Sequence, residues 1–165
     1  MLRAVFVRDA TPGDFDAMVA IYAHWVACST ATFDLAAPAL AERAAWFARC
    51  EAGDPVLVAD DGDAVVGFAY YGAYRSKPGY AATKETTIYV APDARRRGAA
   101  TALYGELIER ARRAGVHTLI GVVSSGNPES DALHRRFGFE PVGTLREVGR
   151  KFDRWVDTIF WQRIL

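Results

Sequence analysis

The chain has 165 residues, which is a usual size for one domain and is enough to bury a hydrophobic core. Hydrophobic residues make up 51% of it and charged residues 24%, a composition that excludes an intrinsically disordered protein. The 20 Lys and Arg residues balance 20 Asp and Glu residues, so overall charge does not favour nucleic acid or an anionic membrane as a partner.

Five elements are predicted in the first half of the chain. Its start is rich in β-branched and aromatic residues and is followed by Asp9-Ala-Thr-Pro-Gly, a sequence typical of the turn between a strand and a helix. Phe15, Met18 and Ile21 then recur at helical spacing. Asp60-Asp-Gly-Asp favours a hairpin turn. The predicted elements are a strand over 2–8, helices over 14–27 and 39–51, and strands over 55–59 and 64–73.

The second half of the chain alternates strands and helices. A β-branched run ends at Ala91-Pro92-Asp93, after which Leu103 and Leu107 recur at helical spacing. The predicted elements are a strand over 83–90, a helix over 98–114, a strand over 117–123, a helix over 128–137, and strands over 140–149 and 155–164. This order, β-α-α-β-β-β-α-β-α-β-β, predicts an α/β (α+β) fold with a mixed, mostly antiparallel sheet and helices on both faces.

The chain shows no linker, repeat or targeting segment, so we expect a single domain over residues 1–165. No apolar run approaches the roughly 20 residues that a membrane-spanning helix needs, and the start lacks the apolar stretch of a secretory signal. These features predict a cytoplasmic protein. Cys28 and Cys50 lie far apart, without a Cys-x-x-Cys pair or a His at metal-ligand spacing, and predict free thiols and no metal site.

The most informative segment is 85–101, where a predicted strand leads through a short loop into a helix. The first turn of a helix leaves backbone N–H groups unpaired, and the helix dipole adds partial positive charge there. Three small residues open this helix and let a phosphate approach the backbone: Gly98, Ala99 and Ala100. Three arginines supply positive charge: Arg95, Arg96 and Arg97. The segment predicts a diphosphate site, and the alternative is a surface turn solvated by arginines.

Two other phosphate motifs are excluded by spacing. The Gly-Lys-Ser/Thr ending of a nucleoside triphosphate loop is absent, and the segment does not fit Gly-x-Gly-x-x-Gly. Nucleoside triphosphates and dinucleotides therefore lose their best support as ligands.

Two stretches carry a resemblance to a known family. The pattern Arg95-x-x-Gly98-x-Ala100 after Ile88-Tyr-Val-Ala-Pro resembles the acetyl-CoA motif of the GNAT superfamily. Downstream, Asn127 and Ala132-Leu-His-Arg-Arg-Phe-Gly-Phe139 are similar to a second GNAT stretch. The resemblance implies the GNAT fold and an N-acetyltransferase that uses acetyl-CoA.

Three further segments resemble one branch of the superfamily. They are Tyr74-Arg75-Ser76, the run around Glu85, and Lys151-Phe-Asp-Arg-Trp155-Val-Asp157. All three are similar to the phosphinothricin and methionine sulfoximine acetyltransferases. This similarity implies that the acceptor is a small molecule, the amine of an amino acid or of such an analogue.

The resemblance implies a set of residues that bind acetyl-CoA. A strand backbone would pair with the amides of the pantetheine arm, as a sheet edge pairs with another strand. The helix start would hold the diphosphate, and Asn127 is also a good helix N-cap, which is its alternative role. The implied residues are Ile88, Tyr89, Val90, Arg95, Arg96, Arg97, Gly98, Ala99, Ala100, Thr101, Asn127 and Arg136.

Glu85 and His134 are the predicted catalytic residues. Glu85 is a carboxylate in a largely uncharged strand, where it could accept a proton from an incoming ammonium, and the alternative is a solvent-facing strand residue. His134 stands where the superfamily often has Tyr, and it could protonate the departing CoA thiolate, while the alternative is a structural histidine of a helix. A backbone N–H near Val90 would stabilise the oxyanion, so the amine would attack the thioester directly.

The resemblance also implies an acceptor site and a dimer. An arginine fork matches a carboxylate, so we expect the acceptor to be bound by Arg75, Ser76, Lys77, Glu85, Thr86 and Thr87. The alternative for residues 75–77 is a plain basic loop. In the resembling branch the last strand contributes to a homodimer, and exposed aromatic residues such as Phe152 and Trp155 suit an interface.

Two other functions stay open at this point. Within catalysis, the acceptor could be a protein N-terminus or a polyamine, although a polyamine would need acidic residues around the site. Outside catalysis, the chain could be a module that binds acyl-CoA without turning it over. That reading keeps the phosphate loop and gives no role to Glu85.

Overall fold

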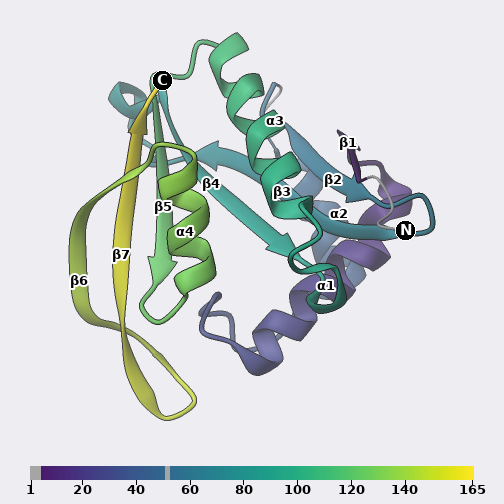
Figure 1. The fold of residues 1–165 in the computed structure, drawn as a ribbon, viewed down its shortest axis with the longest axis horizontal. Helices are drawn as coiled ribbons and strands as arrows, with labels where there is room; N and C mark the ends of the chain where they lie inside the picture. Colours follow the sequence, from purple (N-terminus) through teal and green to yellow (C-terminus); the bar gives the residue numbers. More distant parts are fainter. Residues whose placement is uncertain (1–4, 51–52) are drawn as a thin grey trace.

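The computed structural model describes residues 5–50 and 53–165, and a seven-stranded sheet with helices on both faces runs through them (Figure 1). The strands are β1 (Phe6–Asp9), β2 (Val56–Asp60), β3 (Val65–Ala73), β4 (Thr83–Val90), β5 (Thr118–Ser124), β6 (Glu140–Lys151) and β7 (Arg154–Ile164). The helices are α1 (Phe15–Cys28), α2 (Leu40–Ala48), α3 (Ala99–Arg113) and α4 (Pro128–Arg136), with short 3-10 helices at Pro12–Asp14, Pro78–Tyr80 and Pro92–Ala94.

The order of strands and helices confirms the prediction from the sequence, and most bounds agree within two residues. The strand predicted over 2–8 begins later, at Phe6, although its first three residues lie outside the described part of the chain. The helix predicted over 39–51 ends earlier, at Ala48, and Glu51 is also outside the described part. β6 and β7 extend further toward each other than predicted because they form one long hairpin.

The strand order is β1-β2-β3-β4-β5-β7-β6, and every described pairing is antiparallel except that of β4 with β5. The parallel pairing runs only from Thr83 opposite Thr118 to Thr86 opposite Gly121. Beyond that point β4 continues to Val90 while β3 remains paired along its other edge. β4 and β5 therefore part, as Figure 1 shows, and one edge of β4 is left without a strand partner.

Two hydrophobic clusters cover the two faces of the sheet. On one face, α3 buries Leu103 and Leu107 completely against β2, β3 and β5. On the other face, α1 buries Met18 against Phe68 of β3. Because successive side chains of a strand point to opposite faces, β4 contributes Ile88 to the first cluster and Tyr89 to the second.

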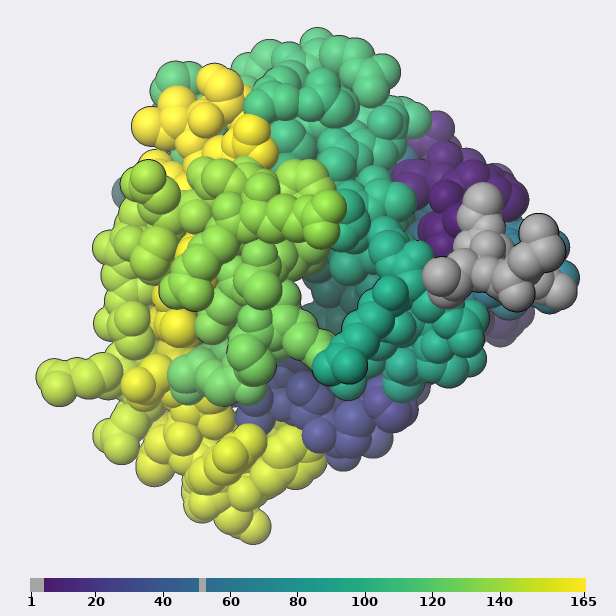
Figure 2. Space-filling view, in the orientation of Figure 1, coloured from purple at the N-terminus to yellow at the C-terminus, as the bar shows by residue number. Residues whose placement is uncertain are grey.

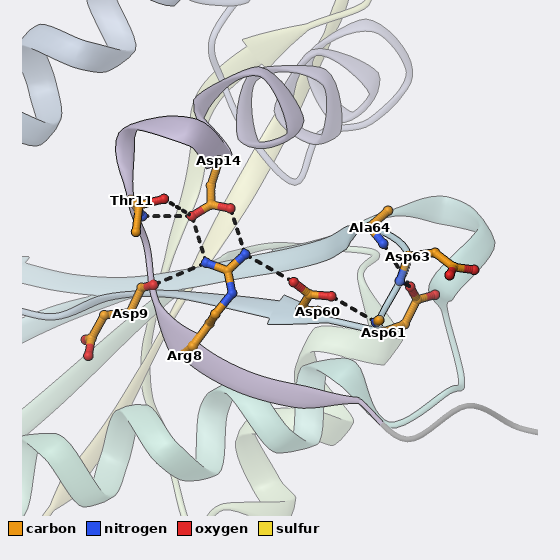
Figure 3. Close-up of polar contacts among 9 residues, drawn as sticks. Arg8, Asp9, Thr11, Asp14, Asp60, Asp61, Asp63 and Ala64 are labelled. Carbon is orange, nitrogen blue, oxygen red and sulfur yellow. Dashed lines mark hydrogen bonds and ion pairs between the residues drawn. The ribbon is translucent and has the colours of Figure 1, made fainter.

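An ion-pair network joins the first strand to the start of α1 (Figure 3). The Arg8 guanidinium donates to both carboxylate oxygens of Asp14 at 2.8 Å and to Asp60 at 3.1 Å. The backbone N–H of Thr11 donates to the same Asp14 carboxylate at 2.7 Å. The hydrogen bonds from Arg8 outweigh burial and lower the pKa of Asp14 to about 2. This network fixes how the chain enters α1 from the outer edge of the sheet.

Candidate active site

A cleft of about 800 Å³ lies where β4 and β5 part. Its walls come from β4, the loop after α1, the start of α3, the end of β5 and α4. Figure 2 shows a hollow there, between the green atoms of the α4 region and the teal atoms around the start of α3. The parting of the two strands thus creates a site open to a ligand.

The start of α3, where the sequence predicts a diphosphate site, lines the cleft. Gly98 has φ of +87°, a left-handed conformation that glycine adopts without strain, and the next three residues also line the cleft. Among the described residues no side chain caps this helix, whose first backbone bond is from Ala102 N–H to the Gly98 oxygen at 2.9 Å. The amides of the first turn are therefore available to an anion, and they fit a diphosphate.

The three arginines before α3 do not act alike. Arg95 and Arg96 line the cleft, whereas Arg97 is exposed and is not among the lining residues. Arg95 forms an ion pair with Glu129 of α4, and its guanidinium lies 5.6 Å from the centre of the Trp25 ring. Arg136 of α4 adds a further positive charge to the lining. The lining therefore carries positive charge from Arg96 and Arg136, while that of Arg95 is paired with Glu129.

The free edge of β4 forms the floor of the cleft. Ile88, Tyr89 and Val90 all line it, so the structure brings the predicted pantetheine-binding strand beside the predicted diphosphate site. Trp25 of α1 donates from Nε1 to the Val90 oxygen at 2.9 Å, and the Tyr89 hydroxyl donates to the Ala31 oxygen at 3.1 Å. These two bonds hold α1 and the loop after it against the floor.

Glu85 lies in the cleft with the properties of a base. It is half-buried, and burial raises the pKa of its carboxyl above the ordinary value. Within residues 5–50 and 53–165, no side chain forms an ion pair or hydrogen bond with this carboxylate. Successive side chains of a strand point to opposite faces, so Glu85 lies on the same face of β4 as Thr87 and Tyr89 and on the opposite face from Thr86. Its acceptor lone pairs are free for an incoming ammonium.

His134 lines the cleft but is only 3% exposed. Its Nδ1 lies 2.7 Å from the backbone oxygen of Ser130, and its Nε2 lies 3.0 Å from the Tyr104 hydroxyl. Because a carbonyl oxygen only accepts, Nδ1 carries a proton, whereas the Tyr104 hydroxyl can donate to Nε2 or accept from it. Burial also lowers the pKa of His134, which favours the neutral ring. The general-acid role stays a prediction, and in this arrangement the ring has no proton directed into the cleft.

Asn127 serves the structural role that the sequence left open and also lines the cleft. Its Oδ1 accepts from the backbone N–H of Ser130 at 3.2 Å, which caps the start of α4. The cap uses one side-chain oxygen, so the amide group keeps two donors for a ligand.

The predicted acceptor residues are only partly brought together. Glu85, Thr86 and Thr87 line the cleft, but the Thr86 hydroxyl is bonded to Tyr104 at 2.8 Å and to the Ile120 oxygen at 3.2 Å. The structure does not place residues 75–77 at the cleft of this chain. That loop precedes β4, whereas the cleft lies along residues 85–90 of the strand. Three predicted acceptor residues are exposed and do not line the cleft: Arg75, Ser76 and Lys77.

Three features of the site were not predicted from the sequence. The loop after α1, from Ser29 to Phe33, lines the cleft although it carries no motif. Trp25 and Tyr104 also line or adjoin the site, and both stand at apolar positions of predicted helices without a motif. A buried tryptophan or tyrosine carries one polar group that needs a hydrogen-bond partner. This need is the only feature of the sequence that could have indicated a role for the two residues.

Neither a metal-binding cluster nor a membrane-spanning helix is found in the described part of the chain. No group of three or more His, Cys, Asp or Glu side chains that could hold a metal ion occurs in the described part of the chain. Among the helices of residues 5–50 and 53–165, none has the length and apolar character that crossing a membrane requires.

Comparison with known proteins identifies the family. The model of the acetyltransferase (GNAT) family matches residues 18–139. An L-methionine sulfoximine/L-methionine sulfone acetyltransferase of Pseudomonas paraeruginosa is 43% identical over 158 residues, which cover 94% of this chain and 92% of that protein.

Two crystal structures share the fold at high identity. A GNAT superfamily phosphinothricin acetyltransferase from Sinorhizobium meliloti in complex with AcCoA is 37% identical with a TM-score of 0.94, covering 98% of this chain and 88% of the other. A ribosomal-protein-alanine N-acetyltransferase from Brucella melitensis is 43% identical with a TM-score of 0.94, covering 97% and 99%. The chain therefore belongs to the acetyltransferase (GNAT) family and is an acetyl-CoA-dependent N-acetyltransferase, as its motifs predicted.

Proposed function

We propose that this enzyme acetylates the amine of a small amino acid or of an analogue of the methionine sulfoximine or phosphinothricin type. The observation that carries the proposal is an unpaired, half-buried carboxylate, Glu85, in the same cleft as the uncapped start of α3. The named activities of relatives at 43% and 37% identity support the acceptor class.

The start of α3 would hold the diphosphate of acetyl-CoA, and the free edge of β4 would align the pantetheine arm. Acetyl-CoA supplies the acetyl thioester. Glu85 takes a proton from the acceptor ammonium, directly or through water, because only the neutral amine has a lone pair for attack. The backbone N–H near Val90 is the proposed donor to the oxyanion.

The leaving thiolate takes up a proton, and the position of His134 indicates that this proton comes from another group. Its Nδ1–H is bonded to the Ser130 oxygen, and its Nε2 lies 3.0 Å from the Tyr104 hydroxyl. We propose that the attacking nitrogen itself loses this proton as the amide forms, which balances the reaction without an acid from the ring. The neutral imidazole then forms part of the cleft wall.

A second acceptor class is supported by one comparison. The structure from Brucella melitensis is named as a ribosomal-protein-alanine N-acetyltransferase and is 43% identical. A protein N-terminus that begins with alanine is therefore the alternative substrate. The carboxylate clamp predicted at residues 75–77 would favour a free amino acid, but it is not part of the cleft of one chain and stays a prediction.

A thiol-release assay with acetyl-CoA and an amine panel tests the proposal. The panel contains methionine sulfoximine, phosphinothricin, a peptide beginning with alanine, and spermidine. We expect methionine sulfoximine to give a kcat/KM at least about tenfold above that of the peptide, a difference of about 1.4 kcal/mol.

The same assay separates the alternatives. Preference for the peptide would assign the enzyme to protein N-termini, and preference for spermidine would assign it to polyamines. Protection by acetyl-CoA against heat unfolding without release of thiol from any amine would show a binding module and would contradict the proposal.

We also infer that the enzyme is a homodimer. The surface of β6 and β7 exposes apolar side chains between 49% and 60%, and β6 is the edge strand of the sheet. These side chains are Val142, Leu145, Val148, Phe152 and Trp155. Light scattering at micromolar concentration should give twice the mass of one chain, and a single-chain mass would contradict this inference. The cytoplasmic location and the single domain over residues 1–165 stay predictions.

A further inference from the structure

Lys151 is a buried lysine at the tip of the hairpin of β6 and β7. It is the last residue of β6, and Phe152 and Asp153 form the two-residue turn, with φ of +50° and +56°. Lys151 is only 4% exposed. A lysine is almost never fully buried unless its ammonium has partners, so those partners indicate what the side chain does there.

The ammonium of Lys151 binds the loop that follows α1. Its Nζ donates to the Ser29 oxygen at 2.8 Å and to the Thr32 oxygen at 2.9 Å. Both partners are backbone oxygens of the segment from Ser29 to Phe33, which we call the 29–33 loop and which lines the cleft. One charged group therefore fixes the curve of a loop that forms part of the cleft wall.

Gly149 provides a second contact between the hairpin and the 29–33 loop. It precedes Lys151 by two residues and so lies on the same face of β6. A Cβ on Gly149 would lie 2.3 Å from atoms of the Phe33 ring, so this ring occupies the place of a side chain. The hairpin thus contacts the loop at both of its ends.

The 29–33 loop lies over the face of β4 that carries the proposed base. From β4, the Tyr89 hydroxyl donates to the Ala31 oxygen at 3.1 Å, and Tyr89 shares its face of the strand with Glu85. An acceptor ammonium must lie on this face to give its proton to Glu85. We infer that Lys151 is a positioning residue for the acceptor, an inference that rests on the proposed function: its ammonium holds the 29–33 loop as the wall beside which the amine binds.

Lys151→Met tests the inference because it removes the donors and keeps a long, unbranched side chain. Two amides report on the loop. Ala31 N–H donates to the Ser29 hydroxyl at 3.0 Å, and Asp34 N–H donates to the Thr32 hydroxyl at 3.1 Å. Hydrogen exchange measured by NMR should be at least about tenfold faster at both amides in the variant, since the loop opens more often without Lys151.

Lys84→Met is the matched control. Lys84 is also a largely buried lysine, with a side chain 11% exposed, and its Nζ forms an ion pair with Asp54 at 2.9 Å. It does not line the cleft. Both variants should lower the melting temperature, but only Lys151→Met should speed exchange in the 29–33 loop. Equal exchange rates in the two variants would overturn the inference.

The kinetics separate positioning from a loss of stability. In Lys151→Met the KM for methionine sulfoximine should rise about tenfold, while kcat and the dissociation constant of acetyl-CoA change less than threefold. Partial unfolding alone would lower kcat and leave KM unchanged, and that result would overturn the inference. If the wild type acetylates no amine of the panel, the proposed function fails, and the exchange experiment still decides whether Lys151 holds the loop.

Gly149→Ala tests the same contact if Lys151→Met does not fold. Its Cβ would displace the Phe33 ring and should raise the KM for methionine sulfoximine at least about threefold. Gly143→Ala is its control on the same strand, because a Cβ there meets nothing within 4 Å, and neither glycine has a positive φ. Equal KM values in these two variants would overturn the inference.

Discussion

Gly98→Val should weaken acetyl-CoA binding by at least tenfold, which corresponds to about 1.4 kcal/mol. Gly98 has φ of +87°, a conformation that costs a β-branched residue more than about 1 kcal/mol. A Cβ at this position would meet no described protein atom within 4 Å, and because Gly98 lines the cleft, the larger side chain would take up space at the predicted diphosphate site. Isothermal titration with acetyl-CoA measures the effect.

Gly115→Val is the control for backbone strain. Gly115 follows the other end of α3, has φ of +73°, and its Cβ would also meet nothing within 4 Å. Both variants should lower the melting temperature, but only Gly98→Val should lower the affinity for acetyl-CoA. Equal affinities in the two variants would contradict a diphosphate site at the start of α3.

Glu85→Gln should lower kcat by about 100-fold or more, the usual contribution of a general base. The amide keeps the size of the side chain but cannot take a proton from the acceptor ammonium. Because Glu85 is not among the residues predicted to bind acetyl-CoA, the dissociation constant of acetyl-CoA should change less than twofold. Steady-state kinetics and titration of the same samples give both values.

The pH dependence gives a second test of Glu85. Burial raises the pKa of this carboxyl above its ordinary value, so its proton is lost, and the base becomes active, only above that raised pKa. In the wild type kcat should therefore fall as the pH drops through it. The fall should be absent in Glu85→Gln and retained in Glu106→Gln, a carboxylate of α3 that is paired with Arg110 outside the cleft. Retention in Glu85→Gln would show that another group is the base.

The sequence was sufficient for features that depend on neighbouring residues. The bounds of β4 agree at both ends, since a β-branched run and the following proline are local signals. Gly98 at the start of α3 and Asn127 as the N-cap of α4 follow from rules that involve only one turn of helix. The predicted diphosphate site is therefore where the structure has an open helix start.

Features that depend on the pairing of distant segments were not predictable. The parting of β4 and β5 requires knowledge of their register, which ends at Thr86 and Gly121. The partners of His134 come from α3 and from its own helix, so its protonation could not be read from its place in a motif. Arg75 matched the motif of an acceptor site, yet its loop lies at the start of β4, outside the cleft.

The central claim is that the backbone amides at the start of α3 bind the diphosphate of coenzyme A. A crystal structure of the enzyme with coenzyme A tests it most directly. We predict diphosphate oxygens at about 2.7–3.2 Å from N–H groups between residues 98 and 101. A diphosphate bound elsewhere, with those N–H groups bonded to the protein's own side chains, would contradict the account.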